Sequence, residues 1–167
     1  MIQPSLNFLN QMDQKSLKCI FEFVQFIVHR HFGLILHLSK ESRDPSFYLF
    51  TLSLIANGLQ STNSTALFCS IECIDSMHNY CIKGSKFYKE ALRELLLLSE
   101  SQQAFMTLVK VNLRSFLRRE TTNRGLKMEC TCKILNMYRV TVDQSNMLFQ
   151  KCALDVSSEF RTTLPLC

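Results

Sequence analysis

Hydrophobic residues recur at intervals of three and four along most of the chain, which is the spacing of amphipathic helices. The pattern is strongest between Lys15 and His29, where the apolar positions are Leu17, Ile20, Phe21, Val24, Ile27 and Val28. The apolar stretch continues to Leu38, and we predict that the helix turns into a second one near His31 to Gly33. Charged side chains within this stretch exclude an ordinary membrane span, although its length approaches one.

Further helices are predicted over residues 45–59, 64–83, 86–98, 103–118, 123–139 and 144–154. Signals at the helix ends support these boundaries. Asp44-Pro45 supplies an N-cap residue and a proline for the first helical position, and Lys83-Gly84 supplies a cation and a glycine suited to a C-terminus. The chain of 167 residues has four glycines and three prolines, too few for the tight turns of a sheet fold. The sequence therefore predicts an all-α fold, with only residues 138–142 ambiguous between helix and strand.

The chain also resembles itself at a spacing of roughly 40 residues, which indicates an internal repeat. Phe47-Tyr48 aligns with Phe87-Tyr88, and the apolar positions 52 and 55 align with 92 and 95. A third copy aligns SLIANGL, residues 53–59, with CKILNMY, residues 132–138. In this alignment Asn57 matches Asn136, while the middle copy has Leu97 at the equivalent position.

A repeat of about 40 residues in a helical chain resembles armadillo and HEAT repeats, whose units bury their apolar faces by stacking on their neighbours. The resemblance implies an armadillo-like α-α superhelix of about three stacked repeats over residues 45–167. Residues 1–44 then form a partial repeat or cap within the same continuous domain. The residues around Asn57 and Asn136 resemble the last helix of an armadillo unit, which implies that both amides face a concave groove and bind an extended peptide. An unrelated helical bundle with the same spacing is the alternative.

Two short segments are similar to one armadillo family in particular. SSEFRTTLPL, residues 157–166, is similar to part of the armadillo domain of the heat shock factor 2-binding protein family, and FYLFTLSLIANGL, residues 47–59, is similar to a second part. Members of that family are meiotic recombination factors. The resemblance implies a nuclear germline protein that captures a recombination mediator on its armadillo surface and forms homo-oligomers.

The net charge of +5 is carried by one part of the chain, residues 100–139. Lys110, Arg114 and Arg118 recur there every fourth residue, so we expect a basic stripe on one helix face, continued by Arg119. Such a stripe attracts an acidic peptide of a protein partner or a nucleic-acid backbone. A merely solvated helix face is the ordinary alternative.

The eight cysteines do not indicate a disulfide framework, because the N-terminus lacks the basic and apolar regions of a secretory signal. We expect reduced thiols in an intracellular protein, nuclear or cytoplasmic, with most of the cysteines serving as small core residues. Cys69, Cys73 and Cys81 share one face of a predicted helix with apolar residues, so we predict core packing there and no metal site.

No catalytic motif is recognisable in the sequence. No serine lies in a nucleophile elbow, and Gly84-Ser85-Lys86 lacks the earlier glycine of a phosphate loop. We therefore predict a protein without enzymatic activity and without a cofactor. The predicted function is that of a protein-interaction scaffold, whose groove binds an extended or helical segment of a protein partner through apolar contacts, Asn57 or Asn136, and the basic stripe. The alternative is a nucleic-acid-binding helical domain that contacts phosphates through that stripe.

Overall fold

The computed structural model describes residues 6–118, 122–142 and 145–163, and every regular element within these ranges is a helix. A short 3-10 helix precedes seven α-helices: η1 (Leu6–Gln11), α1 (Gln14–Glu41), α2 (Ser46–Gln60), α3 (Ser64–Lys83), α4 (Lys86–Leu96), α5 (Ser99–Leu117), α6 (Arg124–Val142) and α7 (Ser145–Thr163). The all-α prediction is confirmed, and the ambiguous residues 138–142 belong to α6. Arg119 lies outside the described residues.

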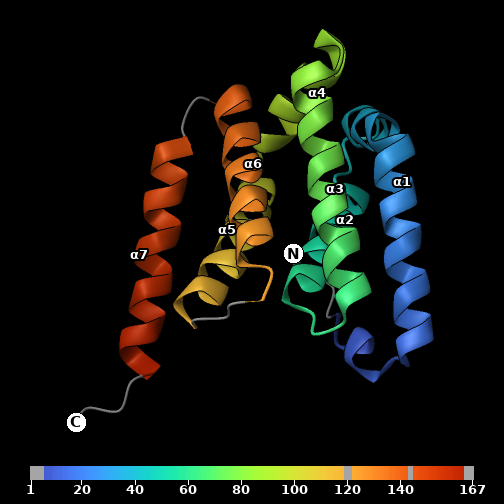
Figure 1. The fold of residues 1–167 in the computed structure, drawn as a ribbon. Helices are drawn as coiled ribbons and strands as arrows, with labels where there is room; N and C mark the ends of the chain where they lie inside the picture. The colour runs from blue at the N-terminus through green and yellow to red at the C-terminus, as the bar shows by residue number, and fades with distance from the viewer. Residues whose placement is uncertain (1–5, 119–121, 143–144, 164–167) are drawn as a thin grey trace.

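Helix α1 begins with a strong N-cap and bends sharply in its middle. The Asp13 carboxylate accepts hydrogen bonds from the backbone N–H groups of Lys15 and Ser16, both at 2.9 Å, which satisfies two donors at the helix start. At His31 the backbone leaves the helical region, with φ −130° and ψ 15°, so the predicted turn is confirmed. The first limb, residues 14–30, runs along the edge of the molecule, and the second limb, residues 32–41, turns away from it (Figure 1).

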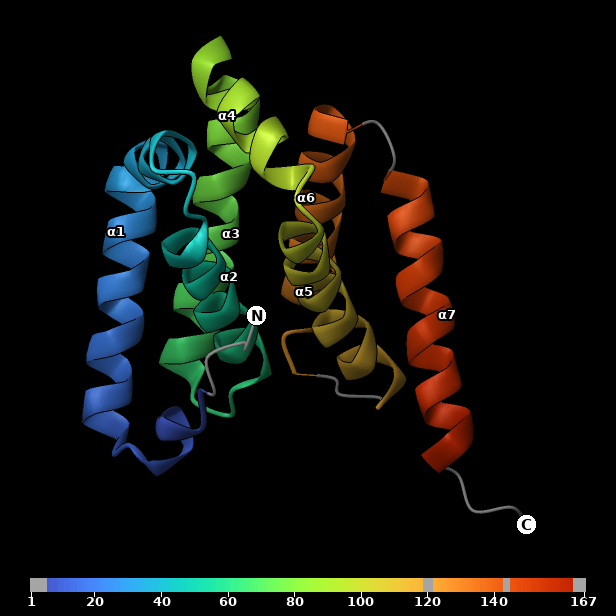
Figure 2. The ribbon, with the colours of Figure 1, turned by 180° about the vertical axis from the view of Figure 1, so that it is seen from behind.

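The helices are arranged in two rows. The first limb of α1, α3 and α6 lie side by side in one row, with α1 packed on α3 and α3 packed on α6 (Figure 1). The view from behind shows α2 and α5 as the second row, with α7 packed against α5 and α6 at the far edge (Figure 2). Helix α4 lies against α6 and α1 at one end of the rows. The two outer edges are therefore formed by α1 and α7.

The core lies between these helices and consists of aliphatic, aromatic and cysteine side chains. Each α-helix contributes at least one fully buried residue, for example Val28, Ile55, Ile74, Leu96, Phe105, Ile134 and Val156. Burial of each such side chain stabilises the fold by roughly 1.5–3 kcal/mol relative to exposure. Within the described ranges most cysteines are buried, and the structure places none in a disulfide: Cys69, Cys73, Cys81, Cys130 and Cys152 are buried, Cys19 and Cys132 exposed. The prediction that most cysteines serve as core residues is confirmed.

The packing of the helices does not follow the alignment at roughly 40 residues. That alignment equates α2 with α4 and α6, and it does match buried positions such as Leu52 and Leu92. In the structure, however, α2 packs beside α5, α3 beside α6, and α1 beside α4. The last contact is close, because a Cβ atom on Gly33 in the second limb would lie 2.7 Å from the Tyr88 ring of α4. The sequence alignment rests on the spacing of apolar residues, which amphipathic helices share. It therefore does not report which helix packs on which.

Candidate interaction site

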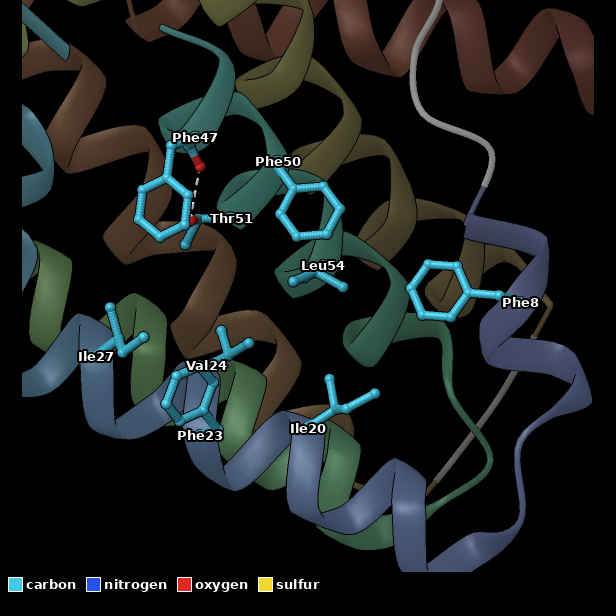
Figure 3. A pocket seen from close by; sticks show the side chains of 9 residues that line it. All are labelled: Phe8, Ile20, Phe23, Val24, Ile27, Phe47, Phe50, Thr51 and Leu54. Carbon is cyan, nitrogen blue, oxygen red and sulfur yellow. Dashed lines mark hydrogen bonds between the residues drawn. The ribbon is translucent and has the colours of Figure 1, made fainter.

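A hollow with a volume of about 240 Å³ opens between α1 and α2 near one edge of the molecule; we call it the α1/α2 groove (Figure 3). Helix α1 contributes Ile20, Phe23, Val24 and Ile27, helix α2 contributes Phe47, Phe50, Thr51 and Leu54, and η1 contributes Phe8. Both helices supply residues at helical spacings of three and four, so one face of each helix forms one wall. The groove therefore lies between the apolar faces of two helices, α1 and α2, whose amphipathic spacing is visible in the sequence.

Large apolar side chains stand exposed around the α1/α2 groove. Phe23 is 63% exposed, Phe47 is 53% exposed and Phe8 is 43% exposed, whereas Leu54 and Val24 are buried and form the floor. Exposed apolar residues are ordinary when scattered singly, but a group of aromatic rings around a hollow marks a binding surface. The α1/α2 groove is thus a part of the described surface on which exposed apolar side chains surround a hollow.

The α1/α2 groove offers no unpaired polar group for catalysis or for polar recognition. Thr51 is the only lining residue with a polar side chain, and its hydroxyl donates to the Phe47 carbonyl oxygen at 2.8 Å within its own helix. Helix α2 also contains no charged residue. Binding in the groove must consequently come from burial of apolar surface and from shape.

A second hollow, of about 260 Å³, lies at the other end of α2 and contains one of the predicted site residues. Its lining is mixed, with Leu9, Leu17 and Phe21 beside polar residues: Asn10, Asn57, Gln60 and Ser61. Asn57 is exposed here, and its amide donates to the Ser53 carbonyl oxygen at 2.9 Å in its own helix. The structure therefore places Asn57 at the surface, facing a hollow of mixed polarity formed with η1 and α1.

Asn136 lies in the contact between α6 and α3. Its side-chain nitrogen is 2.9 Å from Nε2 of His78, and next to it Lys133 pairs with Asp75 at 2.7 Å and with Glu129 at 2.6 Å. Burial lowers the pKa of His78, and the positive charge of Lys133 lowers it further. Asn136 is half-buried in this network, so its amide joins two helices of the same row.

The basic stripe on α5 faces α7. Lys110 pairs with Asp155 at 2.6 Å, and the Arg114 guanidinium donates from Nε and Nη2 to the two carboxylate oxygens of Glu159, each at 2.8 Å. These hydrogen bonds lower the pKa of both carboxyl groups. Two of the predicted cations are thus paired with carboxylates of α7, a helix of the same chain.

The predicted site residues face different neighbours in the fold. Asn57 faces a hollow beside η1, Asn136 contacts α3, and Lys110 and Arg114 contact α7. Arg118 is exposed at the end of α5. The structure does not bring these residues together into one groove. Sequence reasoning missed the α1/α2 groove, although the exposed Phe23 and Phe47 lie on the helices that it predicted.

The described residues contain no group of three or more His, Cys, Asp and Glu side chains arranged to hold a metal ion. Burial raises the pKa of the thiols of Cys73, Cys81 and Cys130, and for Cys81 and Cys130 it raises the pKa to about 12. These cysteines are therefore protonated and unreactive near neutral pH.

Among the described helices only α1 is long and apolar enough to cross a membrane by length and composition. A core helix meets the same two criteria, and α1 buries Phe21, Val24 and Val28 in the fold.

Comparison with known proteins adds no relative: no protein-family model, curated protein or solved structure matches this chain.

Proposed function

We propose that this protein is a non-catalytic interaction module and that the α1/α2 groove receives an amphipathic helix of a protein partner. The observation that carries the proposal is the lining of the groove, in which exposed aromatic rings surround an apolar floor and the one hydroxyl is bonded internally. A helix that lays its apolar face into a hydrophobic groove is a recurrent mode of protein recognition.

The polarity of the groove favours a helical ligand over an extended one. An extended peptide brings unpaired backbone N–H and C=O groups, which cost free energy when they are buried without partners. Thr51 is already engaged and the other lining side chains are apolar, so the groove cannot satisfy those groups. A helix satisfies its own backbone internally and presents side chains at positions i, i+3, i+4 and i+7. Of the extended and the helical segment that the sequence leaves open, we therefore propose the helix.

We further propose that the fold is armadillo-like, with units of three helices. One unit consists of the second limb of α1, α2 and α3, and the next consists of α4, α5 and α6. The packing of α1 on α4, of α2 on α5 and of α3 on α6 supports this division, because stacked repeats place equivalent helices side by side. On this view the first limb of α1 is the last helix of a preceding unit, and α7 belongs to a following one.

The similarity of residues 157–166 and 47–59 to the heat shock factor 2-binding protein family gives the proposal a biological setting. The partner helix then belongs to a recombination mediator, and the protein acts in the nucleus of germline cells. The nucleic-acid alternative receives less support, because Lys110 and Arg114 are already paired with carboxylates of α7. Phosphate contacts by these two cations would have to displace those pairs.

A selection experiment tests the proposal and does not require an identified partner. A library of peptides displayed on phage is selected against the wild-type protein and, in parallel, against Phe47→Ser. We expect the wild-type selection to enrich sequences with apolar residues at helical spacing, and the Phe47→Ser selection to lose them. Enrichment of extended, proline-rich or acidic peptides would contradict the proposal, as would equal enrichment by both proteins. Binding of phosphatidylcholine vesicles without any peptide enrichment would identify the groove as a lipid site instead.

A further inference from the structure

The second hollow, beside η1 and the end of α2, presents hydrogen-bond acceptors that the fold leaves unused. The Asn57 amide nitrogen donates to the Ser53 carbonyl oxygen at 2.9 Å, and the Gln60 amide nitrogen donates to the Ala56 carbonyl oxygen at 3.5 Å. Only the nitrogen end of a carboxamide can donate to a carbonyl, so the orientation of both amides is fixed. The amide oxygens of Asn57 and Gln60 are therefore left as acceptors on the lining of the hollow.

The end of α2 adds further acceptors and a negative partial charge. The last carbonyl groups of an α-helix have no partner within the helix and carry the negative pole of its dipole. Helix α2 has no basic residue in its last turn to neutralise this pole. Among the described residues that line the hollow none is charged. A ligand that fits these acceptors must bring donors, and a positive charge makes such donors stronger.

The floor of the second hollow is apolar, whereas its rim is polar. Leu9, Leu17 and Phe21 are buried there, and Asn57 and Gln60 are exposed. Lysine and arginine side chains match this combination, because each has an alkyl stem that packs on apolar surface and a cationic head that donates hydrogen bonds. An anion is disfavoured, because it would lie against amide oxygens and the negative pole of α2.

We propose that the second hollow binds the ammonium or guanidinium group of a lysine or arginine side chain, and that this side chain belongs to the helix in the α1/α2 groove. The assignment to that helix rests on the proposed function. Leu54 lines the groove and Asn57, three residues later in α2, lines the hollow. Helix η1 also borders both, with Phe8 beside Leu54 in the groove (Figure 3) and Leu9 in the hollow. The partner helix therefore carries its basic residue about one or two turns beyond its apolar strip.

This role of Asn57 differs from the one that the armadillo resemblance implies. In an armadillo groove the asparagine amide pairs with the backbone of an extended peptide, which offers both N–H and C=O groups. The Asn57 nitrogen is already bonded within its own helix, so only an acceptor remains for a ligand. A cationic donor matches that acceptor, and a backbone carbonyl does not.

Titration of the isotope-labelled protein with small amines, followed by nuclear magnetic resonance, tests the site without any peptide. The probes are n-butylammonium and n-butylguanidinium, and n-butanol is the neutral match. We expect both cations to shift the side-chain amide resonances of Asn57 and Gln60 saturably, with dissociation constants on the order of 10 mM for probes of so few atoms. We expect n-butanol to bind about tenfold more weakly. Equal binding of n-butanol, or no saturable shift up to about 100 mM of either cation, overturns the proposal.

Substitutions of Asn57 separate a cation site from a merely apolar hollow, with the Gln60 amide as the reporter. Asn57 is exposed, so its replacement should leave the fold intact. Asn57→Asp should strengthen binding of both cations by roughly two- to fivefold, because it adds a carboxylate. Asn57→Lys should abolish binding, whereas the control Asn79→Lys, at an exposed position of α3, should bind like wild type. Unchanged binding in Asn57→Lys, or an equal loss in Asn79→Lys, would refute the site.

Selection of displayed peptides against Asn57→Lys tests the link to the groove. We expect the selected helices to keep their apolar spacing and to lose the basic residue at a fixed distance from it, whereas Phe47→Ser loses the apolar spacing itself. Apolar helices without such a basic residue in the wild-type selection would overturn this inference and leave the proposed function standing. Binding of the amines without any enrichment of helices would contradict the proposed function and, with it, the assignment of the hollow to a partner helix.

Discussion

The hydroxyl groups of Tyr48 and Ser101 form a buried hydrogen bond, with Ser101 Oγ donating to Tyr48 at 3.2 Å. Both residues have no exposed surface, and they join α2 to α5, which are neighbours in the second row of helices. Burial raises the pKa of the Tyr48 phenol far above its usual value, so the phenol stays neutral. The bond ties the two proposed three-helix units together at a site that water does not reach.

Removing one partner of this bond should therefore cost more than removing both. We expect Tyr48→Phe to lower the free energy of unfolding by about 1–3 kcal/mol, because the Ser101 hydroxyl remains buried without its acceptor. Addition of Ser101→Ala to Tyr48→Phe should recover part of that loss, because no orphaned polar group remains. Urea denaturation of the wild type, both single variants and the double variant measures these differences. Equal losses for the single and double variants would show that the bond does not couple the two helices.

Two glycines in helices provide a matched test of helix packing. A Cβ atom on Gly58 of α2 would collide with Ser70 Oγ and would lie 2.6 Å from the Phe21 ring and 2.9 Å from the Ala66 carbonyl oxygen. Gly58→Ala should therefore destabilise the protein by about 1–3 kcal/mol. Gly125 of α6 has nothing within 4 Å of such an atom, so Gly125→Ala should stabilise it by roughly 0.5–1 kcal/mol through helix propensity. Thermal denaturation of both variants checks the opposite signs.

The contact between α3 and α6 should respond to mild acid through His78. Burial and Lys133 lower the pKa of His78 below its usual value of 6.5, so the fold favours the neutral imidazole. Stability from this residue is fully present above pH 6.5 and is lost as the pH falls through the lowered pKa. We expect His78→Gln to flatten this part of the stability profile while it keeps a polar group near Asn136. Urea midpoints measured between neutral pH and mild acid test this, and an unchanged slope in the variant would exclude His78 as the cause.

The attachment of α7 should depend on its ion pairs with α5. Hydrogen bonds from Lys110 and Arg114 lower the pKa of Asp155 and Glu159, so these pairs support the fold above the usual pKa of a carboxyl group and are lost as the pH falls through the lowered values. Arg114→Glu should increase amide hydrogen exchange in α7, and Arg114→Glu/Glu159→Arg should reverse most of the increase. The effect should be modest and should shrink in high salt, because both side chains are partly exposed. No change in exchange after Arg114→Glu would mean that apolar packing alone holds α7.

Local features of the fold were predictable from the sequence because they depend on neighbouring residues. Helical periodicity and the turn near His31 act within a few positions of the chain. The start of α2 lies one residue later than predicted, because Pro45 and not Asp44 is the N-cap residue. The packing of the helices was not predictable in the same way. Phe47 and Phe87 share a helical position, yet α2 packs mainly on α5 and α3 whereas α4 packs mainly on α1 and α6. Both phenylalanines are about half exposed, although they fit the apolar pattern.

The candidate site was harder to predict because it forms between segments distant in the sequence. The sequence shows Phe8, Phe23 and Phe47 as apolar positions, but only the fold leaves them exposed around one hollow. The pairing of the basic stripe with α7, in contrast, could have been predicted from the sequence. Lys110 and Arg114 are four residues apart, as are Asp155 and Glu159, and matched spacings of opposite charge indicate that two helix faces can pair.

The affinity of a selected helical peptide for wild type and for Phe47→Ser tests the proposed groove most directly. Phe47 is 53% exposed, so its replacement should leave the fold intact, and Leu154→Ser, at a residue 68% exposed on α7, serves as the matched control. Isothermal titration should show a negative heat-capacity change for wild type and for Leu154→Ser, as expected for burial of apolar surface. The account predicts that Phe47→Ser weakens binding by about tenfold or more, while Leu154→Ser binds like wild type. Equal affinity of all three proteins would contradict it.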